Sequence, residues 1–359
     1  MEQRLSQGAG EVGTRPYLPA IDGLRFVAFL LVFFHHLPNP AGSVFAFLNE
    51  RGWIGVEIFL VISSFLLFRN LIEEQEETGK ISIGRFYARR LLRVYPLMVL
   101  FPLAMIVAFG WRDGFLARLL GIVFFSDNFL IWLSGYDPIA YSAHLWTLSY
   151  EFQIYFLIPL AFVLYRSAGR AQFLVALACL LAVALGARLA FILSGVQHPL
   201  IWVTPFLRPE STLLGFALAV GLFASADRFG ALLTLALALI AFSLLPSIDQ
   251  VDGWTLVLYP VAAVVAGSTL WLALNTSLSR FLGARWIVFL GRISFGLYVY
   301  HLLAIGFVSA LLPSLPGNYG TRFLFALALT IALATVSYFV LERPFLTLKK
   351  RFEAVPTVP

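Results

Sequence analysis

Residues 171–193, AQFLVALACLLAVALGARLAFIL, form an almost wholly apolar run in a chain of 359 residues. A hydrocarbon core about 30 Å thick requires roughly 20 apolar residues for each helical span. Comparable stretches recur between Phe26 and Phe345. The sequence therefore predicts an all-α fold, a polytopic transmembrane helical bundle of about ten spans.

The composition supports the membrane class. Hydrophobic residues make up 60% of the chain and charged residues 12%, whereas a typical soluble domain is about 25% charged. The single cysteine, Cys179, lies inside the apolar run, which excludes a disulfide framework and a cysteine metal site. The net charge of +6 comes from basic residues scattered between the spans, so we expect it to reflect topology and not nucleic-acid binding.

Apolar length and Pro/Gly breaks define the predicted spans. They are residues 25–47, 53–71, 94–111, 144–165, 171–193, 206–224, 229–246, 254–274, 286–312 and 322–342. The segment 112–143 is apolar but broken by charges and glycines, which leaves three alternatives: an interfacial segment, a re-entrant segment or an extra pair of short helices.

The distribution of Lys and Arg predicts the orientation. With ten spans both termini share one side, and the loops of that side carry most of the basic residues, as cytoplasmic loops do. They are Lys80, Arg85, Arg89, Arg90, Arg93, Arg166, Arg170, Arg228, Arg280, Arg285, Lys349, Lys350 and Arg351, against Arg51, Arg112, Arg118, Arg208 and Arg322 on the other side. We expect a disordered cytoplasmic lead (1–24), one transmembrane domain (25–346) and a short cytoplasmic tail (347–359).

An ionisable side chain at bilayer depth costs several kcal/mol unless it faces a cavity or a partner, so such residues are functional candidates. In DGLRFVAFLLVFFHHL, Asp22 and Arg25 mark the cytoplasmic mouth of the first span. His36 lies roughly 16 Å further along the helix, near the membrane centre, and His35 points about 100° away from it. An intramembrane histidine can simply bond to a neighbouring helix, or it can take and return a proton, as activation of a hydroxyl requires.

The second and third spans carry a serine pair and an arginine pair. In GWIGVEIFLVISSFLLF, Glu57 lies close to the outer end and Ser63 near the middle, where small hydroxyl residues often serve only close helix packing. In GRFYARRLLRVYPLM, Arg90 and Arg93 share one helical face. Arginine forks suit phosphate oxygens, but the same pair could enforce topology or contact anionic lipid.

The fourth span opens with HLWTLSYEFQIYFLIPL, in which Glu151 follows His144 by about 10 Å and reaches a depth similar to that of His36. The carboxylate must be protonated or paired there, with His36, Arg208 and Arg25 as possible partners. A purely structural ion pair is the alternative.

The ninth span contains LGRISFGLYVYHLL. Arg292 and His301 lie nine residues apart, with Tyr298 between them. Tyrosines near a bilayer face are usually interfacial anchors, so His301 is the stronger functional candidate.

These segments together resemble the integral-membrane acyltransferase-3 family, whose members O-acylate surface sugars, exopolysaccharides and some antibiotics. DGLR followed after ten residues by His36 resembles the family's arginine-to-histidine motif. GVEIFLVISSFLL resembles its second-span signature, RFYARRLLRVYP its arginine pair before Tyr-Pro, HLWTLSYEFQIYFLIP its tryptophan-to-glutamate segment and LGRISFGLYVYH its late histidine segment. The resemblance covers most of the chain.

One feature departs from the family pattern. The second-span signature usually ends Ser-Gly-Phe, and this chain has Ser63, Ser64 and Phe65, which puts a hydroxymethyl group where backbones can approach closely. Some family members carry a fused extracellular esterase-like domain. We expect the stand-alone type here, because few residues follow the last predicted span.

The resemblance implies a multi-pass O-acyltransferase of the bacterial inner or plasma membrane. It would move an acyl group from cytoplasmic acyl-CoA to a hydroxyl group of a carbohydrate or glycosylated acceptor. The family resemblance favours acetyl as that group. By the same resemblance Arg25, Arg90 and Arg93 bind the negatively charged coenzyme.

The catalytic roles implied by the resemblance fall on His36 and Glu151. His36 would act as a general base or as a transient acyl carrier, and Glu151 would orient or charge-balance its imidazole. Four more side chains are expected at the substrate site: Asp22, Ser63, Arg208 and His301.

Two other function classes remain open. Buried His, Glu and Arg across ten spans also describe a proton-coupled transporter, although no inverted repeat or paired broken helices are evident. The buried charges could also only pin helices together in a membrane scaffold. Apart from the histidines there is no metal-like cluster, so no metal is predicted.

Overall fold

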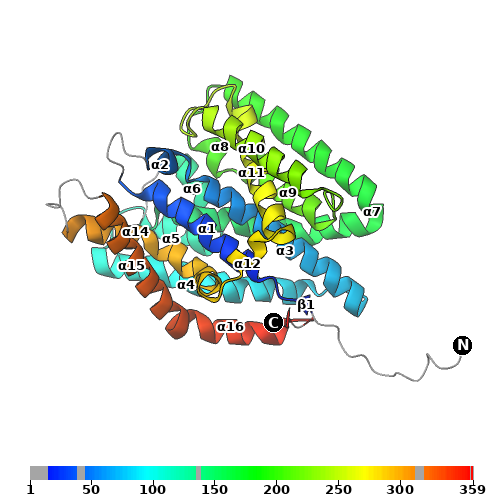
Figure 1. The fold of residues 1–359 in the computed structure, drawn as a ribbon. Coiled ribbons are helices and arrows are strands. Elements are labelled where there is room, and N and C mark those ends of the chain that lie inside the picture. Colours follow the sequence, from blue (N-terminus) through cyan, green and yellow to red (C-terminus); the bar gives the residue numbers. More distant parts are fainter. Residues whose placement is uncertain (1–14, 39–44, 135–138, 312–318, 356, 359) are drawn as a thin grey trace, which may run out of the picture.

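The computed structural model describes residues 15–38, 45–134, 139–311, 319–355 and 357–358, and within them the fold is a helical bundle (Figure 1). Its elements are β1 (Arg15–Pro16), α1 (Pro19–His36), α2 (Ala46–Arg51), α3 (Ile54–Thr78), α4 (Ile83–Phe109), α5 (Phe115–Val123), α6 (Asp127–Ser134), η1 (Ala143–Leu145), α7 (Trp146–Leu193), α8 (Leu200–Val203), η2 (Pro205–Leu207), α9 (Glu210–Ala219), α10 (Arg228–Leu244), α11 (Thr255–Asn275), α12 (Leu278–Leu282), α13 (Arg285–Arg292), α14 (Ser294–Leu311), α15 (Tyr319–Ser337), η3 (Tyr338–Glu342), α16 (Arg343–Lys349), η4 (Lys350–Phe352) and β2 (Thr357–Val358).

Seven of the described helical segments are long and apolar enough to cross a membrane, and α9 and α10 are shorter apolar helices. The long α7 contains two of the predicted spans, because the backbone of Gly169 (φ 81°, ψ 171°) leaves the helical region between them. A left-handed φ of this kind favours glycine. With α7 divided at Gly169 and the two shorter helices included, the described residues hold apolar helices at the places of all the predicted spans, which confirms the polytopic bundle.

The first span is shorter and earlier than predicted. Helix α1 begins at Pro19, inside the predicted disordered lead, and ends at His36, whereas the prediction was 25–47. Leu37 is extended (φ −71°, ψ 134°) because Pro38 follows it, and a residue before proline avoids the helical region. His36 is therefore the last residue of α1 and not the middle of a span. Residues 1–14 of the lead lie outside the described residues.

The ambiguous segment 112–143 contains a pair of short helices, one of the three alternatives. α5 and α6 are joined by a buried ion pair in which Arg118 Nε lies 2.8 Å from Asp127 Oδ1. Residues 135–138 are not described. The third span also differs from prediction, since α4 begins at Ile83 and so includes the basic run that was placed before it.

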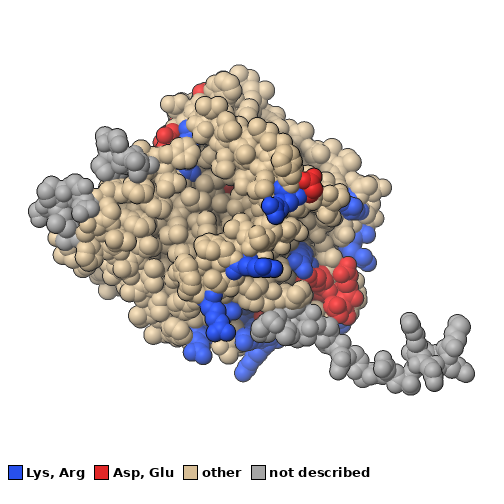
Figure 2. Space-filling model, viewed as in Figure 1, with Lys and Arg blue, Asp and Glu red and all other residues tan. Residues whose placement is uncertain are grey.

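The two described ends of the chain lie side by side. β1 pairs in parallel with β2, with Arg15 opposite Thr357 and Pro16 opposite Val358 (Figure 1). The predicted tail folds onto the bundle, because α16 packs on α4 and Arg89 Nη1 donates to the carbonyl oxygen of Phe352 at 2.7 Å. Lys and Arg side chains gather on this side of the molecule, whereas most of the remaining visible surface is uncharged (Figure 2).

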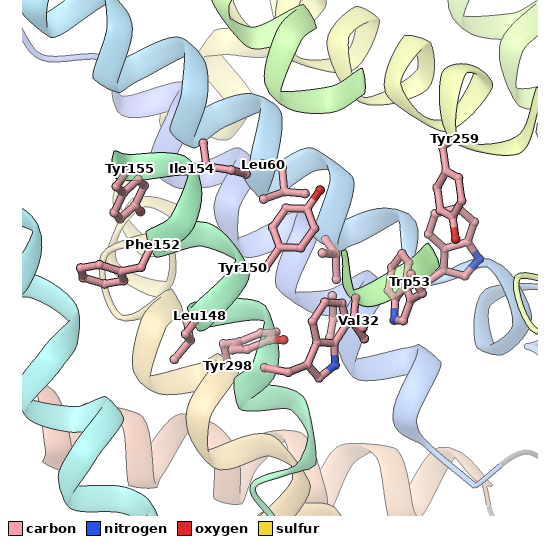
Figure 3. Packing of buried hydrophobic residues seen from close by; sticks show 14 of the residues in the cluster. Val32, Trp53, Leu60, Leu148, Tyr150, Phe152, Ile154, Tyr155, Tyr259 and Tyr298 are labelled. Atoms are coloured by element: carbon pink, nitrogen blue, oxygen red, sulfur yellow. The ribbon is translucent and has the colours of Figure 1, made fainter. Parts of the chain in front are cut away.

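Helix α1 packs against α2, α3, α11, α12, α13 and α14. Glycines allow very close approaches here: for example, a Cβ atom on Gly291 would overlap the backbone oxygen of Asp22, and one on Gly55 would overlap that of Ala28. The largest buried cluster lies beside α1 and includes Tyr150 and Tyr298, from α7 and α14 (Figure 3). This packing determines where the polar side chains of α1 face the rest of the bundle.

Candidate functional site

A cavity of about 230 Å³, here called the basic cavity, lies between α1, α3, α4, α7, α14 and α16. Four cationic side chains line it: Arg25, Arg90, Arg93 and Lys349. Among the described residues, Arg90 Nε is buried without a hydrogen-bond partner and can donate to an added anion. Cations that converge on one cavity suit the phosphate groups of a nucleotide.

The three predicted coenzyme residues are thus brought together by the fold. Arg25 comes from α1, and Arg90 and Arg93 come from one face of α4. Sequence reasoning missed Lys349, because it was assigned to a separate tail, whereas it is the last residue of α16. The basic run Lys349–Arg351 was visible as a charge signal but carried no indication of where it folds.

Glu151 and Ser63 also belong to the basic cavity. Ser63 Oγ donates to Glu151 Oε1 at 2.6 Å, and the hydroxyl of Tyr155 donates to the same oxygen at 2.5 Å. The expected pairing of Glu151 with His36 is not what the structure shows, since His36 lines a different cavity. The expectation was wrong because it placed His36 halfway along a longer helix, at the depth of Glu151.

A second cavity of about 160 Å³, the histidine cavity, lies at the other end of α1. All five histidines of the chain gather there: His35, His36, His144 and His198 line it, and His301 bonds to His36. They come from α1, η1, α14 and the loop before α8. The sequence suggested candidates among them, but not that the five converge.

Hydrogen bonds assign the protonation of His36. His301 Nδ1 lies 2.5 Å from the carbonyl oxygen of Tyr298, so it carries a hydrogen and donates. Nε2 of neutral His301 is then an acceptor, and it lies 3.2 Å from His36 Nδ1. His36 Nδ1 also lies 3.0 Å from the carbonyl oxygen of Val32. Both contacts require a hydrogen on Nδ1 of His36, which leaves its Nε2 as a proton acceptor.

The rim of the histidine cavity combines polar and aromatic groups. His198 Nε2 lies 3.6 Å from Asp249 Oδ1, and the indole rings of Trp53, Trp146 and Trp202 line the wall. Burial lowers the pKa of His198 from its usual value, and the nearby Asp249 carboxylate opposes that shift. His198 and Asp249 were not identified from the sequence, because they lie in loops outside every motif.

Arg208 lies in neither cavity. It is fully buried, forms an ion pair with Glu57, and its guanidinium lies 4.0 Å from the ring centre of Trp202 and 4.6 Å from that of Tyr150. Ser211 donates a hydrogen bond to the same carboxylate. The structure therefore places Arg208 in a buried ion pair with Glu57, and its contact with substrate stays a prediction.

Asp22 also lines neither cavity, but it contacts a residue that does. Its carboxylate accepts from Arg25 Nη1 at 3.2 Å and from the hydroxyl of Tyr17, and Arg292 Nε lies 3.9 Å away. Burial and the neighbouring Asp22 raise the pKa of Tyr17 to about 12, so this phenol remains a donor. Asp22 thus positions Arg25 and does not reach the cavity itself.

Comparisons with known proteins point to one family. A family model described as an acyltransferase domain matches residues 18–341. The O-acetyltransferase OatA of Staphylococcus aureus (strain NCTC 8325 / PS 47) is 26% identical over 96% of the chain and 59% of its own length. A provisionally named O-acetyltransferase of Staphylococcus aureus (strain COL), SACOL0978, is 26% identical over 92% of the chain and 57% of its own length. The chain spans a little under three fifths of these relatives, and no solved structure matches it significantly.

Proposed function

The chain belongs to the acyltransferase-domain family whose model matches residues 18–341, and from that membership we propose that it is a membrane-embedded O-acyltransferase. It transfers an acyl group, acetyl in the first instance, from acyl-CoA to a hydroxyl group of a carbohydrate or glycosylated acceptor. The names of its relatives, which are O-acetyltransferases, support the choice of acetyl.

One observation carries the proposal: a cavity lined by four cations and a cavity lined by histidines adjoin each other within the bundle. Coenzyme A has phosphates at one end and its thioester at the other, joined by a flexible arm. The basic cavity suits the phosphates and the histidine cavity suits the reacting thioester. A single extended donor can therefore occupy both.

His36 is the proposed general base. Its Nε2 takes the proton of the acceptor hydroxyl while that oxygen attacks the thioester carbonyl carbon. The C–S bond then breaks, the new ester bond is retained, and the proton passes from Nε2 to the departing thiolate to give the free thiol of coenzyme A. In the covalent variant Nε2 itself attacks the carbonyl first and later yields the acyl group to the acceptor.

We assign to His301 the role of orienting the His36 imidazole, which the family resemblance implied for Glu151. His301 accepts the Nδ1 hydrogen of His36 and is itself held by the carbonyl oxygen of Tyr298. In hydrolase triads a carboxylate performs this orienting role. A neutral imidazole stabilises the resulting imidazolium less than a carboxylate would, but it fixes the same tautomer.

We assign the basic cavity to the cytoplasmic side of a bacterial inner or plasma membrane. The described chain ends, α16 and most of the Lys and Arg side chains visible in Figure 2 lie on that side, and cytoplasmic loops are enriched in basic residues. The acceptor then approaches the histidine cavity from the outer face. The tryptophan rings and the His198–Asp249 pair there offer the apolar faces and polar groups that a sugar can contact.

The test uses purified protein and its His36→Ala variant, each incubated with acetyl-CoA in detergent and in membrane vesicles. We expect release of free coenzyme A by the wild type and its loss in the variant, with both proteins equally inserted and monodisperse. Mass spectrometry of the wild type distinguishes a transient acetyl-histidine from direct transfer. Substantial turnover by the variant would overturn the role of His36.

A proton-coupled carrier is the rival function, because two adjoining cavities lined by ionisable side chains within a bundle also suit alternating access. The two functions differ in their need for acyl-CoA. Uptake of a glycan or glycoside into proteoliposomes without acyl-CoA would favour the carrier, whereas a product that forms only with acyl-CoA excludes it.

A further inference from the structure

We propose that Val56, Thr147 and Tyr298 form a neck between the two cavities that limits the size of the transferred acyl group. Within the part of the chain that the structure describes, these three side chains line both cavities. The inference rests on the proposed function, because it assigns the donor phosphates to one cavity and the reacting thioester to the other. It identifies a property that the sequence could not supply, namely which acyl group is accepted.

The position of the neck follows from the two binding requirements. The cations that suit the donor line one cavity, and His36 lines only the other. An acyl group attached to a bound donor must therefore pass the neck before its carbonyl carbon reaches Nε2 of His36. Side chains that line only the basic cavity would contact the donor away from its reacting end.

Hydrogen bonds fix the polar half of the neck. The hydroxyl of Tyr298 lies 2.6 Å from Thr147 Oγ1 and 3.1 Å from the carbonyl oxygen of His144. Thr147 Oγ1 donates to the same carbonyl oxygen at 2.9 Å. The backbone oxygen of Tyr298 also accepts from His301, so the same residue holds the histidine pair and one wall of the neck. Widening this wall would require breaking several of these bonds at once.

The apolar half of the neck is fixed by its neighbour in α3. Val56 is largely buried and precedes Glu57, which forms the ion pair with Arg208 and accepts a hydrogen bond from Ser211. These contacts anchor the turn of α3 that carries Val56. A rigid neck can discriminate by size, because an added methylene group then has no space to enter.

The volume beyond the neck points to short acyl groups. The histidine cavity measures about 160 Å³ and must hold the acyl group together with the acceptor hydroxyl. A pocket that fits one chain length typically rejects an extra methylene by about 10- to 200-fold in kcat/KM. We expect acetyl-CoA to be preferred over propanoyl-CoA, and propanoyl-CoA over butanoyl-CoA.

The experiment compares acetyl-CoA and butanoyl-CoA as donors in inverted membrane vesicles from cells that express the full chain, with free coenzyme A as the readout. Val56→Ala should raise the ratio of butanoyl to acetyl kcat/KM by about 10-fold or more. Thr147→Ser, which removes one methyl group but keeps the hydroxyl, should raise it less. Val107→Ala is the matched control, because Val107 lies on α4 and is 87% exposed.

A ratio of two donors is independent of the amount of folded protein, so partial misfolding of a variant does not obscure the result. An unchanged ratio in both Val56→Ala and Thr147→Ser, with wild-type protein that turns over acetyl-CoA, overturns the neck and leaves the proposed function intact. Failure of the wild type to release coenzyme A from either donor overturns the proposed function and the neck with it.

Discussion

His301 Nε2 lies 3.2 Å from His36 Nδ1, although the two residues are 265 positions apart in the chain. The contact joins the last residue of α1 to the middle of α14, and it determines which nitrogen of His36 can accept a proton. Because His301 is itself held by a backbone carbonyl oxygen, the pair is orientated without a carboxylate. This relationship leads to the first prediction.

Replacing His301 by alanine should lower kcat by about 10²-fold or more and leave KM for acetyl-CoA nearly unchanged, because His36 loses the side-chain acceptor that orients its ring, whereas the carbonyl oxygen of Val32 still favours the same tautomer. His301→Gln should recover part of kcat, since its amide can accept from His36 and donate to Tyr298. Steady-state kinetics of the two variants provide the measurement. Equal losses in both variants, or a loss confined to KM, would contradict an orienting role.

Glu151 should influence stability through its two hydroxyl donors. Glu151→Ala leaves the half-buried Ser63 and the buried Tyr155 without their acceptor, and the buried hydroxyl of Tyr155 alone should cost about 1–3 kcal/mol. Glu151→Gln retains an acceptor oxygen and should be milder. Thermal unfolding of the two variants in detergent tests this order; the reverse order, or no difference, would show that the hydroxyls do not depend on the carboxylate.

Lys349→Ala should raise KM for acetyl-CoA by about 10-fold with little change in kcat, because it removes one of the four cations of the basic cavity. The adjacent Lys350→Ala is the matched control, since Lys350 is exposed and does not line the cavity. Donor affinity can also be followed by competition with coenzyme A itself. Equal effects of the two substitutions would show that Lys349 acts only through the general surface charge.

The buried pair of Arg208 and Glu57 should be needed for folding. Arg208→Met leaves the Glu57 carboxylate uncompensated, which typically costs about 3–5 kcal/mol. The double variant Arg208→Met with Glu57→Gln should recover part of that loss. Size-exclusion profiles and melting temperatures give the readout. If Arg208→Met folds normally but does not turn over substrate, the result would instead support a contact between Arg208 and the substrate.

Turnover should be insensitive to metal chelators. Within the described residues, no group of three or more His, Cys, Asp or Glu side chains is placed to hold a metal ion, even though the histidines gather at one cavity. Because the proposed transfer uses His36 as the base and needs no metal ion, the rate with acetyl-CoA should be unchanged after treatment with excess EDTA and its removal. A lower rate that added Zn²⁺ restores would contradict this expectation.

The fold could be predicted from apolar length, because a membrane span leaves a long and nearly unambiguous signal. The boundaries were less certain where one residue decides them. Pro38 ends α1 eleven residues before the predicted end, because apolar length outweighed the proline in the prediction. The break at Gly169, in contrast, lies where the sequence had already separated the spans 144–165 and 171–193.

The sequence predicted which residues belong to the candidate site better than it predicted which of them contact each other. Arg25, Arg90 and Arg93 do line one cavity, because two of them share a helical face and all lie near the same end of the bundle. The assignment of Glu151 to His36 was wrong, since depth along a helix does not say which helix faces which. The convergence of His144, His198 and His301 depends on tertiary packing and has no local signature.

The close glycine contacts of α1 have a consequence for the choice of donor. Arg25 and His36 lie eleven positions apart on one helix, roughly 16 Å, and the close contacts at Gly291 and Gly55 oppose sliding of that helix against its neighbours. The helix therefore holds the anion-binding Arg25 and the base His36 at a fixed separation. A donor analogue whose arm between phosphates and thioester is lengthened or shortened can bind at Arg25, but its thioester does not reach His36.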